Sequence, residues 1–359
     1  MNKYSILDFN HIAIIQTAFL GDVTLSLYLV QAIRNYHKTV NITFVTTPIG
    51  SSIASVCQAI DNIITYDKYG LQKGLDGIKR MSNLLRERKI DCILAPHRSF
   101  RTTLLTFISK PDFSVGFNRN SLSFLYSRRI KYYKHYHEID RNLSLLKAFK
   151  DKSLIPKENI KVDLDIHPAD KTYIENKLNF FKIKENDILI ALAPGSIWNT
   201  KKWPDYHFIE LIIKLKKYDF KTILIGSKED YDLCKKIADN SGGINLAGEL
   251  TIPQVIHFLS NTKLLITNDS APTHLAGLVN CPTLTIYGPT SPIFGFYPKG
   301  KYDKAVELDN LKCKPCSIHG SKQCPVKTHL CMIDLKPDFV LENVIEILKN
   351  TNVFKINEK

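Results

Sequence analysis

Residues 264–290 constrain the fold more than any other stretch of the chain. An apolar run at 264–267 is short enough to be a fully buried strand, and residue types that cap helices, Asn268-Asp269-Ser270, follow it. Pro272 stands where the first helical turn tolerates a missing N–H, and a second strand is expected at Thr283–Tyr287. A strand, a cap, a helix and a strand in so short a span predict a parallel α/β sheet, whose free helix N-terminus suits a phosphate.

The rest of the chain alternates in the same way, in two series. In the first series, strands are expected at residues 11–17, 41–46, 62–66, 90–95 and 113–116, with helices at 23–36, 49–60, 75–88, 99–108 and from 137 onward. A polar stretch at 151–170 contains one strand-like run, 160–164, and precedes a bridging helix at 172–181. In the second series, strands at 187–193 and 221–226 and helices at 206–216 and 229–240 lead into residues 264–290.

Two such series predict an α/β fold of GT-B architecture, with two Rossmann-like doubly wound domains facing each other across a cleft. The expected domains are residues 1–165 and 166–359, because the polar stretch separates the two series. Ligands of open α/β sheets bind beyond the carboxyl ends of the strands, so functional residues are expected there.

Composition and charge limit the kinds of partner. The 359 residues are 44% hydrophobic, and no apolar run approaches the roughly 20 residues of a membrane span. The N-terminal segment is expected to be a first strand rather than a signal peptide, so the eight cysteines are interpreted as reduced thiols of a cytoplasmic enzyme. The net charge of +14 favours an anionic partner: nucleic acid, an acidic membrane surface or a phosphorylated substrate. A lysine-rich solvated surface explains the charge equally well.

A short motif follows the first expected strand. Gly21 allows a sharp turn at the carboxyl end of that strand, and Asp22 is then expected at the start of the next helix, facing the cleft. Taken alone, an aspartate in this position is interpreted more readily as a helix cap than as a catalytic group.

A second motif, PGSIWNTKKWP at residues 194–204, follows the first strand of the second series. Glycine, hydroxyl groups and two lysines at the carboxyl end of a strand suit a diphosphate, and a lysine can stabilise the charge of a leaving nucleotide. Without other evidence, a pair of lysines before Trp-Pro is more often a surface turn.

Three strings together resemble glycosyltransferase family nine, the ADP-heptose:lipopolysaccharide heptosyltransferases. These are the Gly-Asp turn at 21–22, Thr-Lys-Lys-Trp-Pro at 200–204, and Asp-Ser-Ala-Pro-Thr-His-Leu-Ala at 269–276 with Tyr-Gly-Pro-Thr-Ser-Pro after it. The resemblance spans nearly the whole chain and implies an inverting glycosyltransferase. Such an enzyme would move a heptose from ADP-heptose to a lipopolysaccharide inner-core acceptor, with no required metal or cofactor. It would be cytoplasmic and peripheral to the inner membrane, with a last helix at about 338–349 crossing back to the first domain.

The resemblance also assigns catalytic roles. Asp22 would be the general base that takes the proton of the acceptor hydroxyl. Lys201 would be the phosphate lysine, with Ser196 as a hydroxyl contact.

Further donor contacts are expected from the second domain. Asp269 and the backbone amides of Ser270 and Ala271 would meet the diphosphate and the sugar. His274 either reaches the phosphate or packs under the strand ends, and its residue type favours packing. Glu229 is a candidate for the nucleoside ribose.

Acceptor contacts are expected from the first domain. Arg98 and Arg101 follow the fourth strand, and Arg119 begins a basic run, 119–134, with three tyrosines and no acidic residue. This pattern suits the phosphorylated lipid A and core glycolipid at an anionic membrane surface, although a solvated loop fits it equally well.

Four cysteines near the C-terminus have the spacing C-x2-C-x7-C-x6-C, with two histidines nearby. Four thiolates are the right residue types for zinc, but the spacing lacks the second C-x2-C of a zinc ribbon. A metal site and four free thiols therefore both remain open, and neither is needed for the expected reaction. The cysteines are Cys313, Cys316, Cys324 and Cys331.

Other functions fit the sequence less well. A transferase of the same fold that uses another nucleotide sugar, and a catalytically inactive two-lobed sugar-nucleotide-binding protein, are the main alternatives; an Asp22 turned away from the cleft would favour the second. A dinucleotide-dependent oxidoreductase is disfavoured because no G-x-G-x-x-G follows either first strand. Nucleic-acid binding is not expected, since it would need a stripe of positive charge outside the cleft.

Overall fold

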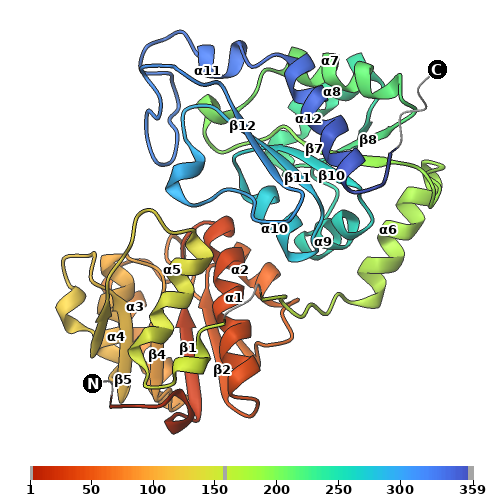
Figure 1. The fold of residues 1–359 in the computed structure, drawn as a ribbon. Helices are drawn as coiled ribbons and strands as arrows, with labels where there is room; N and C mark the ends of the chain where they lie inside the picture. The colour runs from red at the N-terminus through yellow and green to blue at the C-terminus, as the bar shows by residue number, and fades with distance from the viewer. Residues whose placement is uncertain (1–2, 157–159, 355–359) are drawn as a thin grey trace. The chain divides into compact units, whose positions relative to one another are not determined.

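The computed structural model describes residues 3–156 and 160–354, which divide into two compact units with the boundary between Asp165 and Ile166. Each unit is built around its own six-stranded parallel sheet (Figure 1). The doubly wound α/β class expected from the two series is confirmed.

The first unit has the strand order β3-β2-β1-β4-β5-β6, which is the order of the Rossmann fold. Its elements are β1 (His11–Ile15), α1 (Leu20–Tyr36), β2 (Asn41–Thr46), α2 (Pro48–Ala54), β3 (Asn62–Thr65), α3 (Gly74–Glu87), β4 (Cys92–Ala95), α4 (Phe100–Ser109), β5 (Phe113–Phe117), β6 (Arg128–Ile130) and α5 (Glu138–Ser144).

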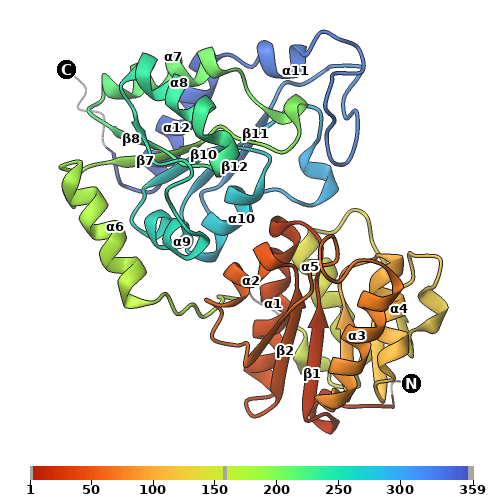
Figure 2. The same cartoon turned by 180° about the vertical axis from the view of Figure 1, so that it is seen from behind.

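The strand order reverses between β1 and β4, where Ala13 of β1 lies opposite Ile93 of β4 and also opposite Thr43 of β2. Helices α1, α2 and α5 pack together on one face, and α3 packs on α4 on the other (Figures 1 and 2). Because ligands bind where the order of a doubly wound sheet reverses, the loops after β1 and β4 are the place for a site in this unit.

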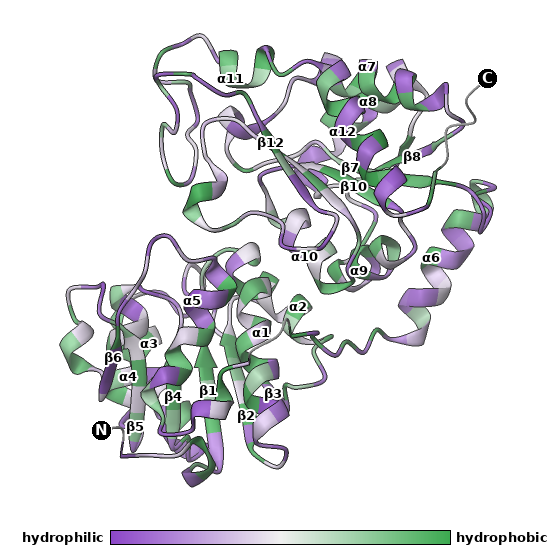
Figure 3. Ribbon diagram, viewed as in Figure 1, coloured by the Kyte–Doolittle hydropathy of each residue, from purple (hydrophilic) through white to green (hydrophobic). Residues whose placement is uncertain are grey.

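The core of the first unit explains why these segments fold as they do. The central strands β1 and β4 are buried on both faces and are mostly hydrophobic (Figure 3). Helix α3 buries only one face, with Ile78, Met81 and Leu85 packed toward Leu105 of α4. Its other face is charged, as expected for a helix at the surface.

The second unit repeats the arrangement, with the order β12-β11-β10-β7-β8-β9. Its elements are α6 (Pro168–Phe180), β7 (Leu189–Ala193), α7 (Asp205–Lys216), β8 (Lys221–Leu224), α8 (Tyr231–Ser241), β9 (Ile244–Asn245), α9 (Ile252–Ser260), β10 (Leu264–Asn268), α10 (Ala271–Leu278), β11 (Thr283–Tyr287), β12 (Lys304–Glu307), α11 (Leu330–Ile333) and α12 (Pro337–Asn350).

Counted from β7, this is again the Rossmann order, and it reverses between β7 and β10. Helices α7, α8 and α12 lie on one face of the sheet, and α9 and α10 on the other (Figure 1). Helix α12 packs on α7 and contributes Val340, Val344 and Ile347 to the core of the second unit. The expectation that this helix crosses back to the first domain stays a prediction.

Several boundaries differ from the sequence expectations. Helix α1 begins three residues earlier than expected, at Leu20, and α2 ends at Ala54 instead of reaching residue 60. The run at 160–164 forms only an isolated bridge between Leu164 and Cys57. Part of the basic run at 119–134 is strand β6, and α9 and β12 occupy segments for which no element was expected.

Candidate active site

Asn268, the last residue of β10, fixes the loop that follows β7. Its buried side-chain amide donates to the carbonyl of Pro194 (2.7 Å) and accepts from the backbone N–H of Trp203 (3.1 Å). The indole of Trp203 is buried and donates to the carbonyl of Leu335 (2.8 Å). Both ends of the 194–203 loop are thereby held at the point where the strand order reverses.

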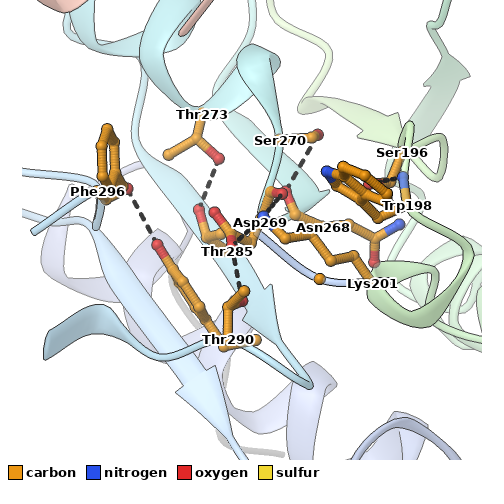
Figure 4. Close-up of polar contacts among 12 residues, drawn as sticks. Ser196, Trp198, Lys201, Asn268, Asp269, Ser270, Thr273, Thr285, Thr290 and Phe296 are labelled. Carbon is orange, nitrogen blue, oxygen red and sulfur yellow. Dashed lines mark hydrogen bonds and ion pairs between the residues drawn. The ribbon is translucent and has the colours of Figure 1, made fainter. Parts of the chain in front are cut away.

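The side chain of Lys201 lies inside this loop and forms a buried ion pair with Asp269 (Figure 4). Lys201 Nζ is 2.6 Å from Asp269 Oδ2 and 3.2 Å from the Asp269 carbonyl oxygen. Thr290 donates its hydroxyl to the same carboxylate oxygen (2.7 Å). Asp269 therefore anchors the lysine, a role that the sequence analysis did not assign to it, and Thr290 is a further site residue that it did not name.

The N-terminus of α10 lies directly after this ion pair. Ser270 is the N-cap but makes no side-chain cap hydrogen bond, so it leaves the first N–H groups of the helix without that partner. The hydroxyl of Thr273 is 3.1 Å from the hydroxyl of Thr285, which ties the first turn to β11 (Figure 4). The positive end of the helix dipole and the cation of Lys201 occur at the same edge of the sheet, which suits a diphosphate.

The C-terminal loop, defined here as residues 308–329, is attached to the residue before Lys201. Thr200 donates its hydroxyl to the Ser321 carbonyl (2.9 Å) and accepts from the Ser321 N–H (2.9 Å). The ring Nε2 of His329 is 2.8 Å from the Thr200 carbonyl. Gly320, at φ +88°, approaches so closely that a Cβ there would lie 3.1 Å from Lys201 Cγ.

Ser196 and Glu229 lie in neighbouring loops. The hydroxyl of Ser196 accepts from the N–H of Trp198 (3.4 Å), so it belongs to the Lys201 loop. Glu229 is exposed, and its pKa is lowered by its own backbone N–H and by the hydroxyl of Ser227. The next residue, Asp230, touches Gly195, where a Cβ would meet its carboxyl at 2.3 Å. A side chain at position 195 would thus displace the Asp230 carboxyl, which accepts hydrogen bonds from Ser227 in the neighbouring loop.

His274 is buried in α10, and its ring lies 6.3 Å from the ring of Phe296. Whether His274 reaches the phosphate or packs under the strand ends stays a prediction. Ala271 is the first residue of α10, so its backbone amide belongs to the helix terminus.

In the first unit, Asp22 is the third residue of α1 and not its N-cap, which is Phe19. Burial raises the pKa of Asp22 to about 7, and the charge of Glu138 adds to this rise. The Arg98 guanidinium and the backbone N–H groups of Phe19 and Asp22 oppose it. The Asp22 carboxyl therefore interacts with the N-terminus of α1 and also has a proton affinity far above that of an ordinary aspartate.

A cluster of charged groups around Tyr132 accompanies Asp22. Glu138 and Arg141 form a buried ion pair (2.7 Å), and Arg141 also donates to the carbonyl of Tyr133 (3.0 Å). The guanidinium carbon of Arg98 lies 4.0 Å from the Tyr132 ring centre, and that of Arg119 lies 6.0 Å from it. The expected acceptor residues Arg98 and Arg119 are thus brought together on one aromatic ring.

Arg101 is placed differently from Arg98 and Arg119. It donates to the carbonyl of Lys68 (2.6 Å), and Lys68 Nζ in turn donates to the carbonyl of Thr17 (2.5 Å). The hydroxyl of Thr17 contacts His97 Nδ1 (3.0 Å), and burial together with Lys68 and Arg98 lowers the pKa of His97 to about 4. Arg101 therefore supports the turn that precedes Asp22.

Comparison with known proteins identifies the family. The model of glycosyltransferase family 9 (heptosyltransferase) matches residues 78–327. The chain belongs to this family. A lipooligosaccharide heptosyltransferase 2 of Haemophilus influenzae is 25% identical over 360 residues, covering 94% of this chain and 99% of its own. A lipooligosaccharide heptosyltransferase 2 of Campylobacter jejuni is 28% identical over 290 residues, covering 79% of this chain and 83% of its own.

The fold agrees with the family. The solved structure of Escherichia coli ADP-heptose LPS heptosyltransferase II superposes with a TM-score of 0.76 at 22% identity, covering 95% of this chain and 99% of that one. The expectation of GT-B architecture is confirmed, and so is the resemblance to family nine. The protein is a glycosyltransferase.

Several residues of this glycosyltransferase's candidate site were not predicted from the sequence. Thr290 lies within a string that carried the resemblance, and Asn268 directly precedes another, so their position was visible but their hydrogen bonds were not. Glu138 and Tyr132 come from separate segments, and only the fold brings them to Asp22 and Arg98. His329 had been noted only beside the cysteines.

The cysteines of the glycosyltransferase are free thiols. The Cys316 thiol donates to the carbonyl of Cys313 (3.0 Å). Within residues 3–156 and 160–354, no three histidine, cysteine, aspartate or glutamate side chains are grouped so that they could hold one metal ion. The Cys316 and Cys331 thiols are nevertheless near enough to the other thiols of the motif for these to raise their pKa, after burial, which is the larger cause. The choice between a metal site and free thiols therefore stays a prediction.

In the same two ranges, the glycosyltransferase has no helix with the length and apolar character needed to cross a membrane.

Proposed function

We propose that this glycosyltransferase transfers a heptose from ADP-heptose to a lipopolysaccharide inner-core acceptor, inverting the anomeric centre in a single displacement. The observation that carries the proposal is the buried Lys201–Asp269 pair (2.6 Å) beside the N-terminus of α10. The names of the relatives, which are lipooligosaccharide and lipopolysaccharide heptosyltransferases, support the choice of sugar and acceptor.

Departure of ADP places growing negative charge on the diphosphate. Lys201 supplies a cation that Asp269 and Thr290 hold in place, and the amides of Ser270 and Ala271 supply hydrogen-bond donors. Such preorganised groups act without reorganising during the reaction. Ser196 lies in the same loop as the lysine and is the proposed hydroxyl contact, and Glu229 is the proposed ribose contact.

Attack by the acceptor requires a base that is ionised near neutral pH. Asp22 fits this role because its raised pKa of about 7 gives it a stronger affinity for a proton than an ordinary carboxylate has. A base with a pKa near the working pH combines adequate ionisation with a good driving force for proton transfer.

Arg98 and Arg119 are proposed to bind the anionic acceptor. Their guanidinium groups meet on the ring of Tyr132, and Arg98 also faces Asp22. The bidentate geometry of guanidinium suits phosphate and carboxylate groups, both of which a phosphorylated lipid A and core glycolipid would present. Such an acceptor lies in an anionic membrane surface, so we place the enzyme in the cytoplasm, peripheral to the inner membrane.

A panel of nucleotide sugars tests the proposal. The purified enzyme is incubated with ADP-heptose, ADP-glucose, UDP-glucose or GDP-mannose, each with and without an inner-core acceptor, and nucleotide release is measured. We expect release from ADP-heptose that depends on the acceptor. Nucleotide release from one of the other donors, and not from ADP-heptose, would favour a transferase for a different sugar. Donor binding without any nucleotide release would favour a catalytically inactive binding protein.

A further inference from the structure

The loop between β3 and α3 and the first turn of α3 expose large apolar side chains, although hydrogen bonds hold the loop in place. Tyr69, Leu71 and Leu75 are 79%, 90% and 71% exposed. Large exposed apolar side chains that gather on one segment mark a candidate interaction site on a protein surface. This segment, residues 67–80, is called the β3–α3 tip below.

Hydrogen bonds order the tip, so its exposure is built into the fold. The carboxylate of Asp67 accepts from the N–H of Gly70 (2.9 Å) and of Leu71 (3.2 Å). The backbone N–H of Asp67 donates to the Gln72 side chain (2.7 Å), and Arg80 donates to the Leu71 carbonyl (3.1 Å). The backbone at residues 67–72 is thus closed on itself with its apolar side chains directed outward.

The charge of the tip shows which kind of surface would cover it. Lys73, Lys79 and Arg80 are exposed, and Asp76 is the one exposed acidic residue of residues 69–80. Large apolar groups flanked by cations fit the interface of an anionic bilayer, where the side chains enter the headgroup region and the cations meet lipid phosphates. An apolar protein partner would not require the cations.

The tip is also connected to the candidate active site. Lys68, at its base, donates to the carbonyl of Thr17 in the turn before Asp22, and Arg101 donates to the carbonyl of Lys68. Strands β1 and β3 belong to one parallel sheet, so the tip and Asp22 extend from the same edge of it. A membrane bound by the tip would lie on the side of this unit from which a lipid-linked acceptor approaches.

We propose that the β3–α3 tip docks the enzyme on an anionic lipid surface by inserting Leu71, Leu75 and Tyr69. The biological role of this docking rests on the proposed function, in which the acceptor is a membrane glycolipid. Lipid binding itself can be measured without any transfer reaction.

Vesicle co-sedimentation tests the inference. Vesicles of phosphatidylethanolamine with and without phosphatidylglycerol are mixed with the full chain, with Leu71→Ser, or with the control Phe180→Ser. Phe180, on α6 of the second unit, is 77% exposed, which makes it a matched apolar surface residue. We expect the native chain to prefer the phosphatidylglycerol vesicles, Leu71→Ser to bind them about tenfold more weakly, and Phe180→Ser to bind as the native chain does.

Transfer assays separate this inference from the proposed function. Leu71→Ser should lose activity toward an acceptor embedded in vesicles and keep native activity toward the same acceptor after removal of its acyl chains. Equal vesicle binding by Leu71→Ser and the native chain, or no preference for phosphatidylglycerol, would overturn the docking proposal. Absence of transfer by the native chain to either acceptor would count against the proposed function and leave the vesicle result standing.

Discussion

At the scale of single residues, opposing effects set the proton affinity of Asp22. Removal from water and the nearby Glu138 carboxylate favour the protonated form, while Arg98 and two backbone N–H groups favour the ionised form. Glu138 is itself buried, and burial raises its pKa, while the ion pair with Arg141 lowers it. Glu138 therefore needs Arg141 to remain charged in the interior. The sequence placed Asp22 after the first strand but could not show Glu138 beside it, because more than a hundred residues separate them.

The pH dependence of catalysis follows from the raised pKa. We expect kcat/KM to rise as pH increases through about 7, because Asp22 must be ionised to accept a proton. Glu138→Gln removes a like charge and should move this rise to lower pH. Steady-state rates between pH 5.5 and 9 test both statements; an unchanged profile in Glu138→Gln would contradict the coupling.

The same shift affects stability with the opposite sign. The folded state holds the Asp22 proton up to about pH 7, whereas the unfolded chain releases it near 3.8. The free energy of unfolding should therefore decrease as pH rises from about 4 to 7, because over this range the folded state binds the Asp22 proton and the unfolded chain does not. Asp22→Asn should not show that part of the loss in denaturant titrations. An identical pH dependence for the two proteins would contradict the pKa assignment.

At the scale of elements, the loops after central strands carry the chemistry and the C-terminal loop supports one of them. Strands β2 and β11 were predicted with the bounds that the structure shows, because both are rich in β-branched and aromatic residues. The missed strands β6, β9 and β12 lie at or beside sheet edges, are short, and carry charged or polar residues. Helix α9 was not predicted, although the capping box of Thr251 and Gln254 marks its N-terminus in the sequence.

The attachment of the C-terminal loop predicts an effect on donor binding. Thr200→Val keeps the shape of the side chain but removes the two hydrogen bonds of the hydroxyl to the Ser321 backbone. The bond from the Thr200 N–H to the Ser321 carbonyl (3.2 Å) and the contact with His329 remain, so the support of the residue before Lys201 is weakened. We expect weaker ADP binding, by roughly 3- to 10-fold, as loss of hydrogen bonds worth about 1 kcal/mol would give. Calorimetry measures it, with Lys322→Ala, an exposed residue of the same loop, as control. Native affinity in Thr200→Val would show that the loop does not position Lys201.

At the scale of the whole molecule, two units of the same topology have separate cores and carry different charged groups. Both series could be predicted from the sequence because each repeats the same alternation of strands and helices. The family resemblance located a motif at each point where the strand order reverses. The ion pair between Lys201 and Asp269 could not be predicted from the sequence. Both residues were expected to contact the donor, but only the tertiary fold shows that they also contact each other. The position of α12 in the core of the second unit is likewise a tertiary feature.

The division between the units predicts where ADP protects the backbone. Saturating ADP should slow amide exchange at residues 194–203 and 268–274 and leave residues 17–22 nearly unchanged, because the proposed diphosphate contacts all belong to the second unit. At about 100 times its Kd, a ligand stabilises its site by about 2.7 kcal/mol. Hydrogen exchange with mass spectrometry tests this, with Lys201→Ala as a control that should lose the protection. Protection centred on 17–22 would reverse the assignment of the units.

The most direct measurement compares donor binding with turnover in Asp22→Asn. A base acts only in the transition state, so the variant should bind ADP-heptose with nearly native affinity while kcat falls roughly 10²–10⁴-fold. Lys201→Ala, measured in parallel, should weaken both donor binding and turnover, because the diphosphate is present in the ground state and the transition state. If Asp22→Asn abolished donor binding and left the turnover of bound donor intact, Asp22 would be a donor ligand or a structural group of α1, and the proposed mechanism would be wrong.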